Sequence, residues 1–277
     1  MKLTGIESLE VPELEPYRTM RRPAEHRASE IFVAEGEKVV RRLVQSDLKI
    51  VSLLITKEWL EAYSRLLAER EIEEGVFVAE KSLLEEIVGY RLHQGIMAIG
   101  RVPAPVDVFK MQRKAGEKFL LVAADGIANS ENMGVIVRNC AAFGVHTLVV
   151  GETSCDPYLR RSVRNSMGTI FQMQISNVES LADALRRLRE ESSFEIVAAH
   201  PRSDSVKLSD VDLTNDVCIV FGSEGEGISD GVLNECTIRT RIPIRDEVDS
   251  MNVASSAGVI LYEAARQRSD LSRRSSM

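Results

Sequence analysis

A polar segment that contains a single arginine is the first place where this sequence could do chemistry. Residues 125–144 have the sequence DGIANSENMGVIVRNCAAFG and follow the apolar run FLLVAA. The asparagines, serine and glycines at its start favour a tight turn, and we expect a helix from Asn132 to Phe143. Arg138 is the one charge on a face of this helix that is otherwise apolar. Such an arginine either reaches solvent, pairs with a structural carboxylate, or belongs to a functional site.

A glycine-rich acidic loop forms the second candidate site. Residues 219–229, IVFGSEGEGIS, run from a buried-looking strand into three glycines that alternate with Glu224 and Glu226. In open α/β sheets, ligands bind beyond the carboxyl ends of the strands, where glycines allow the backbone to come close to them. No lysine follows, and the two carboxylates would repel phosphate. The loop therefore suits a cationic or neutral ligand, with a plain acidic loop as the alternative.

The third candidate site lies between a strand and the last helix. Residues 242–258, IPIRDEVDSMNVASSAG, end a strand, continue as a polar loop and begin a helix near Ser250 to Asn252. Ser250 is a natural N-cap, and the small residues after it allow close packing against another backbone. Simple capping and tight packing would also explain every residue in this segment.

The elements that must position these segments form two α/β blocks. From Phe119 onward, strand-length apolar runs alternate with helical patterns, the last of them over Asn252 to Arg266. The runs are FLLVAA, TLVVG, IFQMQI, EIVAA, VCIVFG and IRTRIPI. Continuous apolar strands separated by helices predict a mostly parallel sheet that is buried on both faces. Strands and amphipathic helices also alternate between Ser29 and Arg101, which predicts a smaller α/β domain.

Changes in composition predict the boundaries of these blocks. We expect an N-terminal extension at residues 1–28, a domain at 29–101, a proline-containing linker at 102–118, a second domain at 119–268 and a flexible tail at 269–277.

Composition excludes several classes of protein. The chain has 277 residues and a formal net charge of −7, and no apolar stretch approaches the roughly 18 residues that a membrane-spanning helix needs. Its first residues lack the apolar core of a signal peptide, so we expect a cytoplasmic protein. The four cysteines and four histidines show no metal-ligand spacing. No metal and no membrane partner are therefore predicted, and the absence of a GxGxxG turn argues against a nicotinamide dehydrogenase.

Taken together and in this order, the three segments resemble the three motifs of the SpoU/TrmH family of RNA ribose 2′-O-methyltransferases, within the SPOUT superfamily. The first motif corresponds to Asn132, Gly134 and Arg138, the second to FGSEGEGIS and the third to IPIRDEVDSMNVASSAG. Between them, residues 157–175 look like the family's basic helix, glycine turn and strand. The resemblance covers residues 119–266. More weakly, residues 29–100 are similar to the ribosomal-protein-like RNA-binding domain that many members carry.

The resemblance implies a C-terminal domain folded as a trefoil knot that binds S-adenosylmethionine, with no metal. The cofactor-binding residues that it implies are Gly222, Ser223, Gly227, Ile242, Met251 and Asn252. The catalytic residues that it implies are Arg138, Asn132, Glu224, Ser250 and Asn252.

Arg138 would lie beside the target hydroxyl and has been proposed as the base in this family. A guanidinium stays protonated at neutral pH, so it is better suited to hold the ribose phosphate and stabilise a developing alkoxide. Asn132 would orient the same group, and the proton would pass to phosphate or water.

The partners implied by the resemblance are RNA and a second copy of the chain. Local basic clusters outweigh the negative net charge in RNA binding, and the expected RNA-binding residues are Arg41, Arg42, Arg160, Arg161 and Arg164. The N-terminal domain favours ribosomal RNA. Transfer RNA, a ribosome modification that confers antibiotic resistance, and a non-catalytic RNA-binding or ribosome-assembly factor are the alternatives. The retained Asn132, Arg138, Glu224 and Asn252 argue against the last of these.

Overall fold

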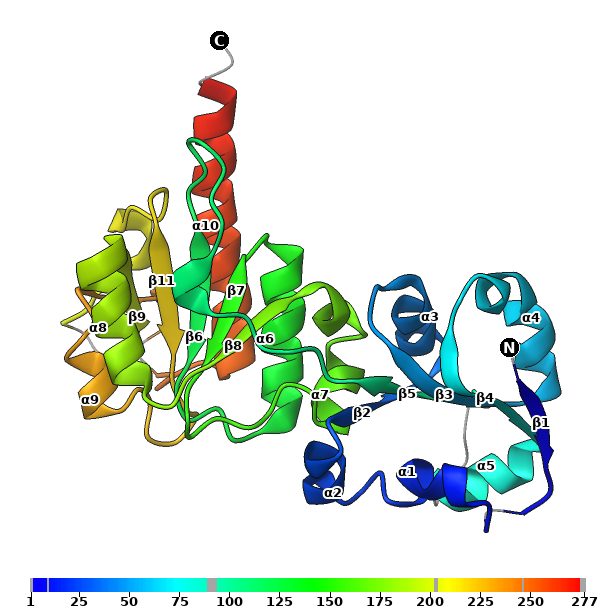
Figure 1. The fold of residues 1–277 in the computed structure, drawn as a ribbon. Helices are drawn as coiled ribbons and strands as arrows, with labels where there is room; N and C mark the ends of the chain where they lie inside the picture. Colours follow the sequence, from blue (N-terminus) through cyan, green and yellow to red (C-terminus); the bar gives the residue numbers. More distant parts are fainter. Residues whose placement is uncertain (1, 9, 89–93, 202–203, 246, 275–277) are drawn as a thin grey trace. The chain divides into compact units, whose positions relative to one another are not determined.

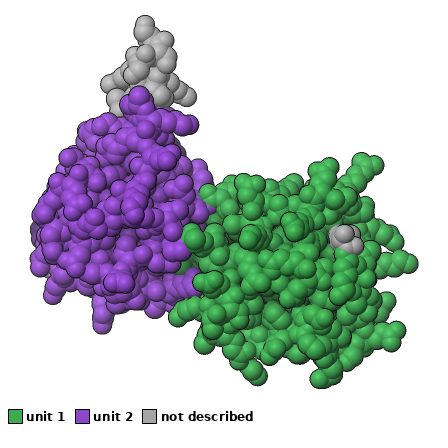
Figure 2. Space-filling model, in the orientation of Figure 1, with its two compact units in different colours: residues 1–104, 157–172 green, residues 105–156, 173–277 purple. Residues whose placement is uncertain are grey.

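The computed structural model divides the chain into two compact units (Figures 1 and 2). It describes residues 2–8, 10–88, 94–201, 204–245 and 247–274. The N-terminal unit comprises Met1–Ala104 together with Pro157–Gln172. The C-terminal unit comprises Pro105–Asp156 and Met173–Met277.

A five-stranded sheet forms the centre of the N-terminal unit, with the order β1-β4-β3-β5-β2. Strands β1, β4 and β3 are parallel, and β5 is antiparallel to both β3 and β2. The strands are β1 (Leu3–Ile6), β2 (Ile31–Glu35), β3 (Ile50–Ile55), β4 (Ile72–Ala79) and β5 (Ile96–Arg101).

Helices cover both faces of this sheet, with α3 and α4 on one face and α1 and α5 on the other (Figure 1). The α-helices are α1 (Glu15–Arg18), α2 (Pro23–Ala28), α3 (Glu37–Gln45), α4 (Lys57–Ala68), α5 (Lys81–Val88) and α7 (Arg160–Asn165). The 3₁₀ turns are η1 (Pro12–Leu14) and η3 (Thr169–Gln172). Residues 1–28, expected as an extension, supply β1 and the buried core residues Leu14, Tyr17 and Met20. Their apolar side chains are the physical reason that they fold with the unit.

Seven parallel strands form the sheet of the C-terminal unit, in the order β10-β12-β9-β11-β6-β7-β8. The strands are β6 (Leu120–Ala124), β7 (Thr147–Val150), β8 (Gln174–Asn177), β9 (Glu195–Ala199), β10 (Val206–Lys207), β11 (Val217–Phe221) and β12 (Ile238–Arg241). Every residue of β6 and β11 is buried. This agrees with the α/β class and the double-sided burial expected from their continuous apolar sequences.

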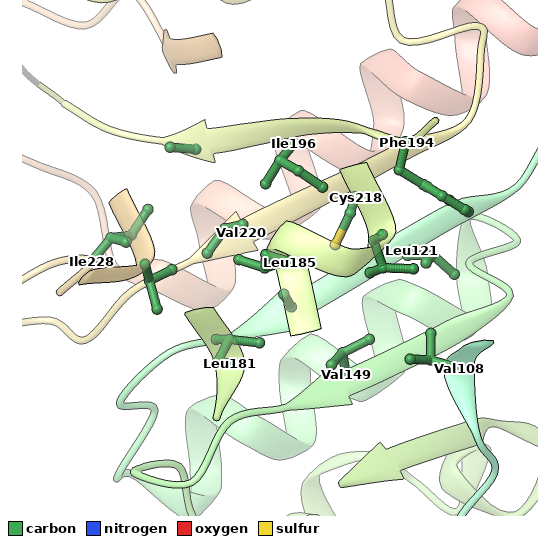
Figure 3. Close-up of a cluster of buried hydrophobic side chains, with 14 of the residues drawn as sticks. Val108, Leu121, Val149, Leu181, Leu185, Phe194, Ile196, Cys218, Val220 and Ile228 are labelled. Carbon is green, nitrogen blue, oxygen red and sulfur yellow. The ribbon is translucent and has the colours of Figure 1, made fainter. Parts of the chain in front are cut away.

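Helices pack on both faces of the seven-stranded sheet. On one face, Leu181 and Leu185 of α8 point toward Ile196, Cys218 and Val220 of β9 and β11 (Figure 3). On the other face, α10 packs along α6. The helices are α6 (Ser130–Ala142), α8 (Leu181–Ser192), α9 (Asp230–Leu233) and α10 (Val253–Arg274), with 3₁₀ turns η2 (Val108–Lys110) and η4 (Leu208–Asp210).

The expected linker packs against the C-terminal unit for most of its length. Val108 is buried in the core cluster of this unit, with Phe109 and Met111 against it. The guanidinium carbon of Arg187 lies 3.7 Å from the centre of the Phe109 ring. The apolar residues at 108–111 therefore outweigh the proline and charge signals that suggested a linker.

Two expected elements differ from the structure. The run IFQMQI was expected to be one strand, but Thr169–Gln172 forms η3 and β8 begins only at Gln174. The tail at 269–277 was expected to be flexible, but α10 continues to Arg274. Arg268, just before this segment, donates hydrogen bonds to the carbonyl oxygens of Leu213 and Lys118, at 2.9 and 2.8 Å. These bonds tie the helix to the unit.

Among the described residues, none of the helices has both the length and the apolar character needed to cross a lipid bilayer. The same residues contain no cluster of three histidine, cysteine or carboxylate side chains that could hold a metal ion.

Candidate active site

A cavity of about 700 Å³ lies at the carboxyl ends of β9, β11 and β12. Four segments line it, and each directly follows a strand or begins α10: residues 199–201, 221–230, 240–244 and 249–256. Because all the strands are parallel, their carboxyl ends share one edge of the sheet. The topology thus brings together the second and third candidate sites, which are separated in the sequence by α9 and β12.

The acidic loop is folded tightly against itself. A Cβ atom on Gly222 would lie 2.2 Å from the carbonyl carbon of Gly227, so only glycine fits there. Ser223 and Gly227 exchange backbone hydrogen bonds of 2.9 and 3.2 Å, and Gly227 has a φ of +75°. The buried Asp125 carboxylate, at the end of β6, accepts a 2.7 Å hydrogen bond from the backbone N–H of Ser229. The first segment therefore holds the far end of the loop.

Asn252 joins all three candidate segments. Its amide nitrogen donates a 3.0 Å hydrogen bond to Oδ1 of Asn132 and a further hydrogen bond to Oε1 of Glu224. Its amide oxygen accepts from the backbone N–H groups of Ala254 and Ser255, at 3.0 and 3.1 Å. One side chain thus caps α10 and links α6 to the acidic loop.

Ser250 is not the N-cap of the last helix, contrary to the prediction. The helix begins at Val253, and the cap is Asn252. Ser250 lies two residues farther out, exposed, although it lines the cavity. The N–H groups of Ala254 and Ser255 in the first helical turn donate to Asn252 instead.

Arg138 lies outside the apolar face to which the sequence analysis assigned it. Met133, Val137 and Cys140 are fully buried, whereas Arg138 is exposed. Each residue turns an α-helix by about 100°, which places Arg138 well away from its neighbour Val137. No hydrogen bond or ion pair joins the Arg138 guanidinium to any residue that the structure describes.

Carboxylates dominate the charge around the cavity. Glu224, Glu226, Asp230 and Asp249 line it, with one arginine, Arg241, whose Nε donates to the carbonyl oxygen of Ser205 at 3.3 Å. Closely placed negative charges favour a cationic ligand and disfavour an anionic one. This agrees with the ligand charge expected from the acidic loop.

All six expected cofactor-binding residues line the cavity: Gly222, Ser223, Gly227, Ile242, Met251 and Asn252. The expected catalytic residues divide into three groups. Glu224, Ser250 and Asn252 line the cavity, Asn132 is hydrogen-bonded to it through Asn252, and Arg138 does neither.

The part of the cavity at the end of β9 was not expected from the sequence. Ala199, His200 and Pro201 line it, and the backbone N–H of His200 donates to the carbonyl oxygen of Thr240 at 2.8 Å. These residues have no motif of their own. Their position at the end of the buried run EIVAA was the available signal, since ligands bind beyond the ends of parallel strands.

Comparison with known proteins identifies the group to which this chain belongs. The model of the SpoU rRNA Methylase family matches residues 119–262. An uncharacterized tRNA/rRNA methyltransferase of Mycobacterium tuberculosis is 30% identical over 263 residues, which are 92% of this chain and 89% of the relative. The chain belongs to the SpoU rRNA methylase family. The activity that follows at a coarse level is methyl transfer to RNA.

Solved structures share the fold over nearly the whole chain. An rRNA methyltransferase from Sinorhizobium meliloti has a TM-score of 0.81 at 24% identity, covering 96% of this chain and 98% of its own. The SpoU methyltransferase AviRb from Streptomyces viridochromogenes, in complex with AdoMet, has a TM-score of 0.79 at 23% identity, covering 92% and 99%. The matched regions extend over both units, so the fold of each unit is shared with these proteins.

The five arginines expected to bind RNA all lie in the N-terminal unit of this SpoU family member. Arg41 pairs with Glu37, and Arg42 donates to the carbonyl oxygen of Met167 at 2.7 Å. Arg160 and Arg164 approach Glu35, with shortest N–O distances of 2.7 and 3.6 Å. Arg161 is exposed, and its guanidinium has no ion pair within the described ranges.

Proposed function

We propose that this protein methylates a ribose 2′-hydroxyl of RNA with S-adenosylmethionine as methyl donor, and that ribosomal RNA is its substrate. The observation that carries the proposal is Asn252, which links Asn132 to Glu224 beside a carboxylate-lined cavity. These are three of the residues to which the family resemblance gives catalytic roles.

The cavity suits S-adenosylmethionine in size and charge. Ligand pockets of this type measure roughly 300–1,000 Å³, and the cavity of about 700 Å³ lies within that range. When bound, the cofactor supplies an electrophilic methyl group on a positively charged sulfur, which the surrounding carboxylates favour. The backbone at Gly222, Ile242 and Met251 would hold it, with Ser223, Gly227 and Asn252 closing the loops. The trefoil knot of the SPOUT fold is part of the same proposal.

The polar side chains of the site would orient the reacting groups. Methyl transfer requires the ribose oxygen, the methyl carbon and the sulfur to lie in line, so orientation is the main contribution of the protein. Asn132 accepts from Asn252 through Oδ1, which leaves its amide nitrogen available as a donor to the ribose. Glu224 fixes Asn252 from the other side, and Ser250 borders the same opening.

Arg138 is the group proposed to hold RNA. It is exposed, so an RNA phosphate can reach its guanidinium without displacing an internal partner. A bidentate contact with the phosphate beside the target ribose would orient the nucleotide and stabilise negative charge on the 2′-oxygen. The proton then passes to phosphate or water.

A homodimer formed through α6 and α10 is part of the proposal. Val259 and Tyr262 on α10 are 38% and 58% exposed, and Tyr262 makes an edge contact with Phe143 at the end of α6. Large apolar side chains exposed on one helix, beside a partly exposed aromatic ring at the end of the next, are typical of a protein interface. The expected cytoplasmic location fits an enzyme that acts on RNA.

Methyl transfer to RNA fractions tests substrate and cofactor together. Labelled S-adenosylmethionine is incubated with unmodified ribosomal RNA and, separately, with unmodified transfer RNA. The proposal predicts label in ribosomal RNA. Label in transfer RNA alone would correct the substrate, and cofactor binding without transfer to free RNA or to ribosomal particles would favour the non-catalytic RNA-binding alternative.

A further inference from the structure

A buried carboxylate connects two segments that are far apart in sequence. Glu35, the last residue of β2, is 7% exposed, and its Oε2 accepts from Nε and Nη2 of Arg160 at 2.9 and 2.7 Å. Arg164, one turn farther along α7, lies 3.6 Å from Oε1. All three residues belong to the N-terminal unit, although α7 lies in the stretch of sequence matched by the methyltransferase family model.

Apolar contacts hold the same segment to the same strand. The Phe32 ring of β2 lies 5.4 Å from the Tyr158 ring and 5.2 Å from the Phe171 ring, measured between centroids. Arg42 of α3 donates to the carbonyl oxygen of Met167. Residues 157–172 are therefore attached to the N-terminal sheet and α3 at both of their ends.

This attachment places basic side chains from two regions on one unit. Arg41 and Arg42 lie on α3, and Arg161 and Arg164 on α7; all four are exposed. Arg160 differs, because its side chain is only 18% exposed and its guanidinium bonds Glu35 twice. A buried ion pair contributes little net stability, since desolvation of both charges offsets their attraction. The ion pair between Glu35 and Arg160 does hold α7 in one fixed position against β2.

We propose that Glu35 and Arg160 are positioning residues for RNA: their ion pair fixes α7 against β2, so that Arg161, Arg164 and the α3 arginines form one phosphate-binding surface. Arg160 then acts through Glu35 and does not itself contact RNA. The proposal rests on RNA being the substrate, and it gives Arg160 a different role from the direct RNA contact expected from the sequence.

Replacing Glu35 by glutamine tests this role, because simple electrostatics and positioning predict opposite results. Removing a carboxylate near arginines should tighten RNA binding if charge alone matters. Positioning predicts that Glu35→Gln raises the Kd for in vitro transcribed ribosomal RNA by about fivefold, the size of a typical coupling effect. Affinity for S-adenosylmethionine, measured by calorimetry, should not change.

Glu73→Gln is the matched control. Glu73 pairs with Arg101 at 2.8 Å in the same unit, but in an exposed position. Both variants remove one negative charge, so their long-range effects on RNA are equal. Glu73→Gln should leave the Kd unchanged or slightly lower it. Equal Kd values for the two variants would overturn the positioning role.

Two more variants separate positioning from direct contact and guard against misfolding. Arg160→Lys keeps the charge but loses the paired bonds to Oε2, and it should weaken RNA binding as Glu35→Gln does, with thermal unfolding confirming a folded unit. In the Glu35→Gln background, Arg160→Gln should cost nothing further. A further loss with a lower salt dependence would show that Arg160 contacts phosphate and would refute the proposal.

The outcome for the proposed function is read separately. Wild-type protein that transfers methyl groups while Glu35→Gln binds RNA like Glu73→Gln would reject the positioning role alone. Wild-type protein that binds RNA in a Glu35-dependent way without transferring methyl groups would reject only the proposed reaction.

Discussion

At the scale of single residues, the site depends on the amide side chain of Asn252, which makes two sets of hydrogen bonds. Asn252 uses its oxygen to cap α10 and its nitrogen to join Asn132 and Glu224. An aspartate could cap the helix equally well, but it has no amide hydrogens to donate. Replacing Asn252 by aspartate should therefore keep the helix cap and remove the hydrogen bonds to Asn132 and Glu224.

Asn252→Asp should abolish methyl transfer while leaving the protein folded. The new carboxylate would face the Glu224 carboxylate, so we expect kcat/KM to fall by at least about 100-fold. The midpoint of thermal unfolding should change little. Ser255→Ala, an exposed position in the first turn of the same helix, is the control and should retain activity. Near-normal turnover by Asn252→Asp would contradict the role given to the amide nitrogen.

Arg138→Lys tests whether the forked guanidinium is needed. Lysine keeps the charge but cannot bind a phosphate in the bidentate way, so kcat should fall by about 100-fold with unchanged cofactor affinity. Single-turnover methyl transfer and calorimetry measure the two quantities. The same exchange at Arg187, exposed on α8, is the control. Normal turnover by Arg138→Lys would show that only the positive charge of Arg138 is needed, and not its forked shape.

At the scale of elements, the last helix is held in place by an arginine among carbonyl groups. Arg268 donates to the carbonyl oxygens of Leu213, Lys118, Phe119 and Asn215, which lie just before β6 and β11. Burial lowers the pKa of this guanidinium, partly offset by the charges of Asp216 and Asp212. The side chain therefore joins α10 to the two central strands.

Arg268→Lys should destabilise the C-terminal unit. An ammonium group has three donors and cannot reach four carbonyl groups at once, which leaves buried acceptors unpaired. We expect the free energy of unfolding by urea to fall by about 2 kcal/mol. Arg266→Lys, at an exposed arginine that pairs with Glu263 on the same helix, should change it by less than about 0.5 kcal/mol. Equal effects would show that the carbonyl contacts contribute nothing.

Much of the C-terminal architecture could be predicted from the sequence, but the cap of the last helix and one of the strands could not. Buried parallel strands follow from continuous apolar runs, and strand ends mark the cavity. The N-cap of α10 could not be predicted, because Ser250 and Asn252 are both good capping residues. The local sequence does not show which of the two reaches Glu224. The run IFQMQI was misassigned because Phe171 packs on Phe32, more than a hundred residues away.

At the scale of the whole molecule, charge distribution matters more than total charge. The chain carries a net charge of −7, yet its expected RNA-binding arginines all lie in the N-terminal unit, and carboxylates line the cavity of the other unit. The sequence could not reveal that residues 157–172 join the N-terminal unit. Apolar residues indicate that a segment is buried, but not which core buries it.

Salt dependence should report this local charge. RNA affinity should fall as salt rises, and Arg161→Gln should reduce the slope of log K against log salt by roughly 0.7–0.9, the value for one phosphate contact. Arg187→Gln, which removes an equal charge from α8, should leave the slope unchanged. A slope that responds equally to both variants would mean that net charge, and not a defined surface, governs RNA binding.

The most direct test of the central claim is alkaline hydrolysis of RNA after labelled methyl transfer. A 2′-O-methyl group blocks cleavage of the adjacent phosphodiester bond by alkali. We therefore expect the label in an alkali-resistant dinucleotide of ribosomal RNA. That product should be absent with Arg138→Ala and with Asn252→Ala. Label recovered only in ordinary mononucleotides would place the methyl group on a base and contradict the assignment of the ribose as target.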